Sequence, residues 1–391
     1  MPRAELSNYK GREQAYIKHY LLERYLPVWG FKVGSKWEAL VYVDGFAGPW
    51  ETTDPNYLDS SFAVAIDALR KCRLGLQSRG LSLSVSAILV ENDPEAFAKL
   101  ESFAKSNHDS EVSVTAIQGK FIDNILKIDQ LVQSAGQQTF KFVLLDPKGW
   151  VDIPMQKLRL FLKTPSCEVL ITLMTKHIIR FLKEENRAAS YDNLFERRGV
   201  LKALQNAAGD ERTELAVKEY CKSLQMLCGF RFVSSAVILE PEESQTRYFL
   251  VYATNHPRGI EVFKAAENKA AKAQEILRHE IYLQKSGKAT QGTLFKEDAP
   301  ISTYAFRLLQ RYRNRARVKV LECLKNAPQS TIVYERLFCE AMAFPLVTPD
   351  DLLGWLDDFD PYIELHPTGG HRKLSPSRPD YIVILDRERL R

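Results

Sequence analysis

The chain has 391 residues, too many for one ordinary hydrophobic core, and this length favours two or three domains, of which we expect two. Hydrophobic residues make up 45% of the sequence and no apolar run approaches the length of a membrane span, which favours a soluble globular protein over a membrane protein. The net charge of +5 is too modest to indicate nucleic-acid binding by itself. The first residues resemble neither a secretory signal nor a transit peptide, so we expect a cytoplasmic location.

The cysteines show no pattern that would bind a metal. No Cys-x2-Cys pair occurs, and no histidine stands at metal spacing from a cysteine. We therefore expect reduced, mostly buried thiols, with neither disulfide bonds nor a metal site. The six cysteines are Cys72, Cys167, Cys221, Cys228, Cys323 and Cys339.

The first predicted element is an amphipathic helix over residues 12–29. It places Ile17, Leu21 and Tyr25 at helical spacing, and we expect it to end near Pro27.

Short apolar runs after this helix predict the strands of a sheet. They lie at residues 39–43, 86–90, 112–117, 140–145 and 168–173. Helical patterns separate them, at residues 60–72, 94–106, 121–135 and 153–163. This alternation predicts an α/β fold in which helices cover a mostly parallel, Rossmann-like sheet. Two later runs, 232–239 and 248–253, have only a short connection and predict an antiparallel hairpin that closes the sheet.

Changes in composition divide the chain into two predicted domains. Residues 176–229 are helical and highly charged, which predicts an insertion between sheet strands. Residues 286–301 have the composition of a linker, so we place the first domain at 1–285 and the second at 302–391. The second domain reads as three helices followed by a β-ribbon, which is the order of a winged-helix-like α+β domain.

The loop Asp44-Gly45-Phe46-Ala47-Gly48 follows the first predicted strand. Its two glycines allow the backbone to approach a ligand closely, at the carboxyl end of a strand, where open α/β sheets bind their ligands. A plain turn between strand and helix is the alternative interpretation.

Glu91 ends the next apolar strand along the chain. A carboxylate at this position can accept hydrogen bonds from both ribose hydroxyls of a bound nucleoside. The separation of Glu91 from Gly48 is about twice the roughly 20 residues of a simple dinucleotide fingerprint, so an extra helix must lie between them. The alternative is a solvated acid that caps the following helix.

A third strand ends in an acid at Asp146, and Pro147, Lys148, Gly149 and Trp150 follow it. The loop resembles one of amino-methyltransferases, in which the aspartate carboxylate and the proline carbonyl face the target amine and an aromatic ring stacks on a flipped base. The carboxylate would act by positioning and charge matching, without a metal. An ordinary Asp-Pro turn is the alternative.

Two further residues are predicted to bind the cofactor. Phe121 follows another strand end and is expected to edge the adenine pocket. Lys18, on the first helix, is expected to close over the cofactor from above, although an exposed lysine on a helix is usually only solvated.

Basic residues in the second domain suggest contact with DNA or RNA. Arg307, Arg311 and Arg315 form an i+4 ridge on one predicted helix, able to track phosphates, and Arg372 and Lys373 lie in the predicted wing. Acidic residues at both ends of the predicted recognition helix would repel a DNA backbone, so a protein-binding role for this domain stands beside the nucleic-acid role.

The ordered set of motifs resembles the three-Cys-motif partner proteins of bacteria and phages, over about residues 10–280. The motifs are Lys18-x6-Tyr25-x3-Trp29, Tyr42-x-Asp44-Gly45-Phe46-Ala47-Gly48-Pro49, Val90-Glu91-Asn92-Asp93, Leu145-Asp146-Pro147-Lys148-Gly149-Trp150 and Thr172-Leu-Met-x3-Ile178-x-Arg180-Phe181. The chain departs from the family pattern at Lys148, where an aromatic residue is usual, and at 59–62, where Gly-Ser-Pro is expected.

This resemblance implies a class I methyltransferase sheet, S-adenosylmethionine as the cofactor, and association with a separate protein that carries three cysteines. It places Asp44, Gly45, Gly48 and Glu91 on the cofactor side. Asp146, Pro147 and Trp150 fall on the reaction loop. Two hypotheses remain: an S-adenosylmethionine-dependent methyltransferase acting on a nucleobase amine or similar group, and a non-catalytic adaptor that uses the same fold to dock the cysteine-motif protein.

Overall fold

The computed structural model describes residues 6–48, 52–286 and 301–390. Pro49 and most of the predicted linker at 286–301 lie outside this description. Among the described residues, no helix is both long and apolar enough to cross a membrane.

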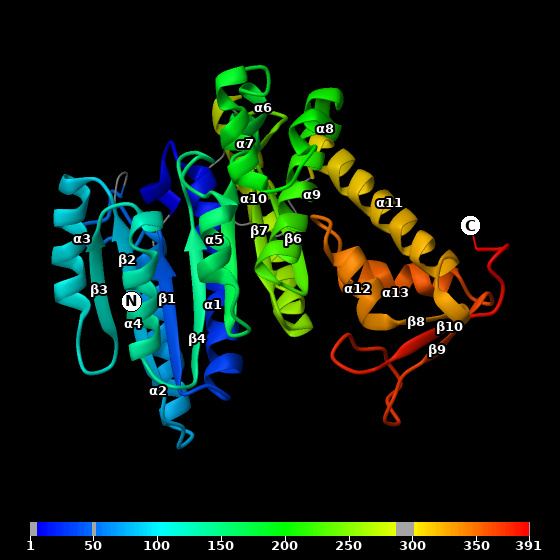
Figure 1. The fold of residues 1–391 in the computed structure, drawn as a ribbon, viewed down its shortest axis with the longest axis horizontal. Helices are drawn as coiled ribbons and strands as arrows, with labels where there is room; N and C mark the ends of the chain where they lie inside the picture. The colour runs from blue at the N-terminus through cyan, green and yellow to red at the C-terminus, as the bar shows by residue number, and fades with distance from the viewer. Residues whose placement is uncertain (1–5, 49–51, 287–300, 391) are drawn as a thin grey trace.

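A seven-stranded sheet of order β3-β2-β1-β4-β5-β7-β6 forms the centre of the larger part of the chain (Figure 1). The strands from β1 to β5 run parallel, and β7 is antiparallel to both of its neighbours. The prediction of a mostly parallel, Rossmann-like sheet with a terminal hairpin is confirmed. The strands are β1 (Ala39–Asp44), β2 (Ser84–Glu91), β3 (Ser113–Gln118), β4 (Thr139–Leu145), β5 (Cys167–Leu173), β6 (Phe232–Leu239) and β7 (Thr246–Thr254).

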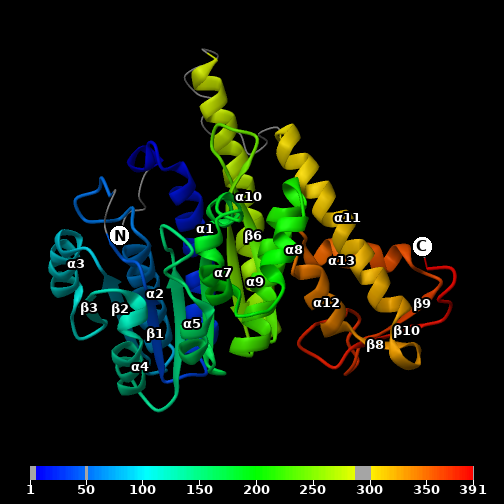
Figure 2. The ribbon, with the colours of Figure 1, turned by 45° about the horizontal axis from the view of Figure 1, so that its top comes forward.

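Helices cover both faces of this sheet, which is why the central strands are continuous apolar runs. Every residue of the central strands β1 and β5 is buried, and so is every residue of β6 at the edge of the sheet. On one face α1 contacts α2 and α10, and on the other α5 contacts α9 (Figures 1 and 2). The helices are α1 (Glu13–Gly34), α2 (Ser61–Gln77), α3 (Pro94–Asn107), α4 (Ile125–Ser134), α5 (Met155–Leu162), α6 (Thr175–Arg180), α7 (Ala188–Phe195), α8 (Val200–Asn206), α9 (Gly209–Cys228) and α10 (Pro257–Lys285).

The first helix does not end near Pro27, as its sequence predicts, but continues to Gly34. A proline inside a helix costs about 3 kcal/mol because it lacks the N–H donor and crowds the preceding turn. Leu26 and Trp29, on either side of it, are almost completely buried. Burial of these side chains offsets the local cost, so packing decides where this helix ends.

The predicted insertion at 176–229 contains α6 to α9, between β5 and β6 in sequence. The C-terminal part packs beside β6 and α10, where Ser234 donates to the carbonyl of Met342 at 2.6 Å and Lys264 to that of Phe344 at 2.7 Å (Figure 2). In it a three-stranded antiparallel sheet of order β8-β10-β9 accompanies three helices. These elements are α11 (Thr303–Lys325), β8 (Thr331–Val333), α12 (Tyr334–Met342), α13 (Pro349–Asp358), β9 (Ile363–His366) and β10 (Tyr381–Ile384).

Gly259, in the first turn of α10, is required by close packing. A Cβ atom there would lie 2.5 Å from the hydroxyl of Tyr252 and 2.8 Å from that of Thr254. The Gly259→Ala variant is therefore expected to lose about 1–3 kcal/mol of unfolding free energy, because these buried hydroxyls have little room to move. Urea denaturation measures the loss, and Gly354→Ala, where a Cβ meets nothing within 4 Å, is the control. Equal stabilities of the two variants would contradict the argument.

Candidate functional site

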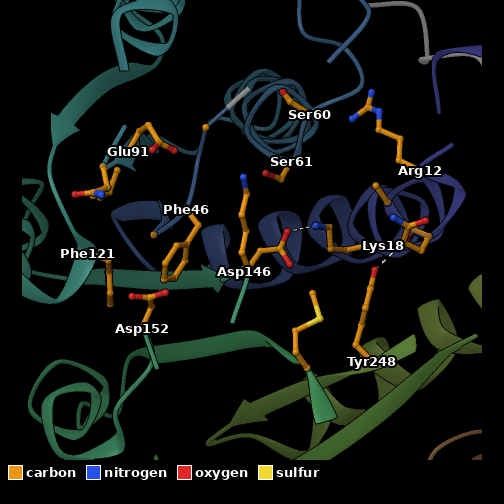
Figure 3. A pocket seen from close by; sticks show the side chains of 18 of the residues that line it. Arg12, Lys18, Phe46, Ser60, Ser61, Glu91, Phe121, Asp146, Asp152 and Tyr248 are labelled. Carbon is orange, nitrogen blue, oxygen red and sulfur yellow. Dashed lines mark hydrogen bonds and ion pairs between the residues drawn. The ribbon is translucent and has the colours of Figure 1, made fainter. Parts of the chain in front are cut away.

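A cleft of about 920 Å³ lies at the carboxyl ends of the parallel strands. Its volume suits a nucleoside-sized ligand together with part of a second molecule. The structure brings most of the predicted site residues to this one cleft, from segments far apart in sequence (Figure 3). The predicted residues that line it are Lys18, Gly45, Phe46, Gly48, Glu91, Phe121, Asp146 and Lys148.

Asp44 does not line the cleft but organises the loop that does. Its side chain is completely buried and accepts hydrogen bonds from Ser61 Oγ at 2.7 Å, Tyr42 Oη at 3.0 Å and the Phe46 N–H at 3.2 Å. Burial raises the pKa of this carboxyl, whereas the bonds from Ser61 and Phe46 oppose that shift. Asp44 thus holds the turn after β1 in shape.

Gly45 lets this turn pass close to its neighbours. A Cβ atom at this position would meet Leu145 Cδ2 at 2.7 Å and the ring of Phe121 at 3.0 Å. Phe46 and Phe121 face each other with ring centroids 6.4 Å apart, and both line the cleft (Figure 3). They provide an apolar wall beside the loop, of the kind that suits a flat heterocycle.

Glu91 ends β2, and its carboxylate is turned toward the cleft (Figure 3). The side chain is only 4% exposed, and Oε1 accepts the N–H of Asp93 at 2.6 Å. The pKa of Glu91 is raised, mainly by burial. The N–H groups of Asp93 and Asn92 and the charge of Lys148 oppose this shift. Because Asp93, rather than Glu91, caps α3 through the N–H groups of Glu95 and Ala96, the alternative of a capping role for Glu91 is wrong.

Asp146, at the end of β4, forms an ion pair with Lys18 of α1 across the cleft (Figure 3). Lys18 is buried, so the packing around α1 fixes the position of its side chain. Lys18 lines the cleft, and its role as a residue that closes over the cofactor stays a prediction. Its contact is with Asp146, which sequence spacing did not indicate.

The residues that follow Asp146 divide between the cleft and the core. Lys148 is exposed and lines the cleft. Pro147 is buried and is not among the residues that line the cleft. Trp150 is 2% exposed and packs on Tyr191 of α7, with ring centroids 4.7 Å apart. The prediction that Trp150 stacks on a base is therefore corrected: the helical insertion covers this ring and makes it part of the core.

The segment at 59–62, which departs from the family pattern, is built into the site. Ser60 caps α2 by accepting the N–H of Ala63, and Ser61 holds Asp44. Asp59 is completely buried, pairs with Arg12 and accepts the N–H of Thr53 at 3.0 Å.

The N-terminal segment closes one side of the cleft. His19 is buried, and its Nδ1 lies 3.0 Å from the hydroxyl of Tyr9. Burial lowers the pKa of His19 well below its ordinary value, and the charges of Lys18 and Arg12 lower it further, so this ring is neutral at pH 7. Tyr248 of β7 donates to the carbonyl of Gln14 at 3.1 Å and ties this segment to the sheet.

Sequence reasoning missed the cations that line the cleft beyond β5. Lys176 and Arg180 come from α6, and Arg247 comes from the start of β7. Glu240, at the end of β6, accepts from Lys176 at 2.6 Å and from Arg247 at 3.1 Å. Arg180 could have been predicted, because it lies in the last of the family motifs. The positions of Lys176 and Arg247 at the cleft could not, because they depend on the antiparallel placement of β7.

The predicted basic ridge on α11 faces acids of α9. Arg311 pairs with Asp210 at 2.6 Å and with Glu214 at 3.0 Å, and Arg315 also pairs with Glu214. Arg307 is exposed and donates to the carbonyl of Thr303. In the wing, Arg372 and Lys373 are exposed.

No family model and no curated protein matches the chain. Among solved structures, a DUF574 family protein from Streptomyces avermitilis aligns with a TM-score of 0.34 and 11% sequence identity, over 61% of this chain and 82% of its own.

Proposed function

We propose that this protein is an S-adenosylmethionine-dependent methyltransferase that acts on an amine, with a nucleobase amine as the expected acceptor class. The observation that carries the proposal is that Glu91 and Asp146, at the ends of β2 and β4, line one cleft on opposite sides of the loop after β1. The sheet supports it, since an antiparallel β7 between β5 and β6 is typical of class I methyltransferases.

The cofactor half of the cleft fits a nucleoside by its chemistry. Glu91 offers a carboxylate to the ribose hydroxyls, and Phe46 and Phe121 offer an apolar wall to the adenine. At Gly45 and Gly48 no side chain separates the backbone of this loop from a ligand in the cleft. The bound cofactor would supply a methyl group on a positively charged sulfur.

The acceptor half is organised around Asp146. Its carboxylate would accept an N–H of the amine, orient the nitrogen lone pair, and match the positive charge that develops on nitrogen. Lys18 forms an ion pair with this carboxylate and so occupies it in the absence of an acceptor. An acceptor amine must displace Lys18 or share the carboxylate with it.

Calorimetric titration with S-adenosylhomocysteine tests the cofactor site. The Glu91→Ala variant is expected to bind about a hundredfold more weakly, since it can no longer form two charge-assisted hydrogen bonds to the ribose. Glu101→Ala, which removes an exposed acid of α3, is the control and should bind as the wild type does. If the wild-type protein binds neither S-adenosylhomocysteine nor S-adenosylmethionine at millimolar concentration, the proposed function is wrong.

The engagement of Asp146 by Lys18 also favours a second candidate, a non-catalytic adaptor that docks a cysteine-motif protein. In that case the cofactor binds without turnover. Transfer of a labelled methyl group to any amine acceptor would contradict a purely structural role.

We also propose that residues 302–391 form a winged-helix-like domain. Supporting this, the order of elements is helix, strand, two helices and two strands, and the first strand, β8, pairs with the last, β10. Asp350 and Asp351 at the start of α13 make this helix a poor match for a DNA backbone.

A further inference from the structure

We infer that the acceptor is carried on a single-stranded nucleic acid, and that its phosphates contact a cationic rim formed by Lys176, Arg180 and Arg247. This inference rests on the proposed function, because it names the acceptor of the same site. The rim lies on the acceptor side of the cleft, away from Glu91.

The topology of the sheet brings the rim next to Asp146. β5 pairs with β4, so α6, which follows β5, begins beside the carboxyl end of β4. β7 runs antiparallel to β5 with Leu173 opposite Phe249, and Arg247 therefore lies at this same edge. Phosphates held here would flank an acceptor group that is placed at Asp146.

The positive charges of the rim are only partly neutralised by acidic side chains. Lys176 and Arg247 share one cleft-lining acid, Glu240, which follows β6. Arg180 is exposed and lines the cleft, and its described contact is with the face of the Phe181 ring, 5.4 Å from the centroid. Three cations thus face one carboxylate, which leaves the rim electropositive and suited to an anion.

An aromatic ring accompanies the cations. Phe181 is partly exposed and lies beside the guanidinium groups of both Arg180 and Arg187, the latter 4.9 Å from its centroid. Cations combined with an accessible aromatic ring are typical of surfaces that bind single strands, where bases stack and phosphates are neutralised. A free nucleotide would need only one such contact.

The ridge on α11 is less suited to this task. Asp210 and Glu214 of α9 already neutralise Arg311 and Arg315, and Asp351 pairs with Arg313 at 3.0 Å. A strand that bound there would have to break these ion pairs. The rim on α6 and β7 needs no such rearrangement at Arg180.

Fluorescence anisotropy with short labelled DNA and RNA single strands tests the inference. At low salt, Arg180→Glu is expected to weaken binding by at least about tenfold. The slope of the logarithm of affinity against the logarithm of salt concentration should become shallower by roughly 0.7 for each phosphate that is no longer neutralised. Arg180→Lys, which keeps the charge, should retain most of the affinity. Lys127→Glu makes the same charge reversal on exposed α4 and should change binding by less than about twofold.

The failures of the two proposals are distinguishable. If the wild type binds S-adenosylhomocysteine but neither strand, or if Arg180→Glu and Lys127→Glu behave alike, the rim is not a nucleic-acid site and the proposed function stands. If adenosine monophosphate competes as well as a strand at equal phosphate concentration, the acceptor is a free nucleotide and the inference is wrong. If strands bind at the rim but the cofactor does not, the methyltransferase proposal is wrong, and the rim binds single strands without holding a methyl acceptor.

Discussion

Replacing Asp146 with asparagine is expected to slow methyl transfer by about two to three orders of magnitude, with little change in the affinity for S-adenosylhomocysteine. Asparagine keeps the shape of the side chain and one acceptor oxygen, but it cannot match the positive charge that develops on the acceptor nitrogen. Single-turnover transfer of a labelled methyl group to an oligonucleotide gives the rate, and calorimetry gives the cofactor affinity.

The ion pair with Lys18 requires a control, because Asp146→Asn also leaves a buried ammonium without its partner. Lys18→Met removes that ammonium, and the double variant Lys18→Met/Asp146→Asn removes both charges. The double variant should remain as slow as Asp146→Asn. Recovery of the wild-type rate in the double variant would show that Asp146 acts only by neutralising Lys18, and the assignment of Asp146 to the acceptor would be wrong.

Replacing Glu267 with alanine is expected to lower the free energy of unfolding by about 3–5 kcal/mol. Glu267 and Lys264 of α10 form a buried ion pair at 2.5 Å, and the exposed fractions of their side chains are 4% and 0%. Glu267 also accepts the N–H of Leu346 at 2.8 Å, so it joins α10 to the C-terminal part of the chain. Loss of the carboxylate leaves a buried ammonium whose remaining contact is the carbonyl of Phe344.

Burial lowers the pKa of Lys264 and raises the pKa of Glu267, and the pair opposes both shifts. A double variant, Lys264→Met/Glu267→Leu, should therefore recover most of the stability, since it removes both desolvated charges. Glu261→Ala, which breaks an exposed pair with Arg258, should cost less than about 1 kcal/mol. Urea denaturation in which Glu267→Ala is no less stable than Glu261→Ala would contradict the argument.

The local sequence pattern was sufficient to predict the sheet. It also predicted that Asp146 and Lys148 lie at the site, but not that Pro147 and Trp150 are buried away from it. Each strand of the larger sheet appears in the sequence as an apolar run, and the acids at the ends of β2 and β4 lie where parallel strands deliver side chains to one edge. Glu91 and Asp146 could be found for this reason, because a strand that ends in an acid places that acid at the edge whatever the helices do. The position of Gly45 follows from the same rule.

Contacts between distant segments could not be predicted in this way. Trp150 has the sequence context of a stacking residue, but Tyr191 of the insertion covers it. The α11 ridge has the spacing of a phosphate-binding surface, but Arg311 meets Asp210, 101 residues away. In both cases the partner belongs to another segment, and docking brings the two together.

The sequence by itself determined the α/β class, the mostly parallel sheet and the two acids at its carboxyl edge, because these depend on periodicity and on strand ends. Tertiary structure alone decided that Lys18 meets Asp146 and that α1 continues past Pro27. It also decided that Lys176, Arg180 and Arg247 line the cleft, whereas Arg311 and Arg315 of α11 pair with acids of α9. The physical reason is that burial and ion pairing depend on which surfaces pack together, and no local spacing records that.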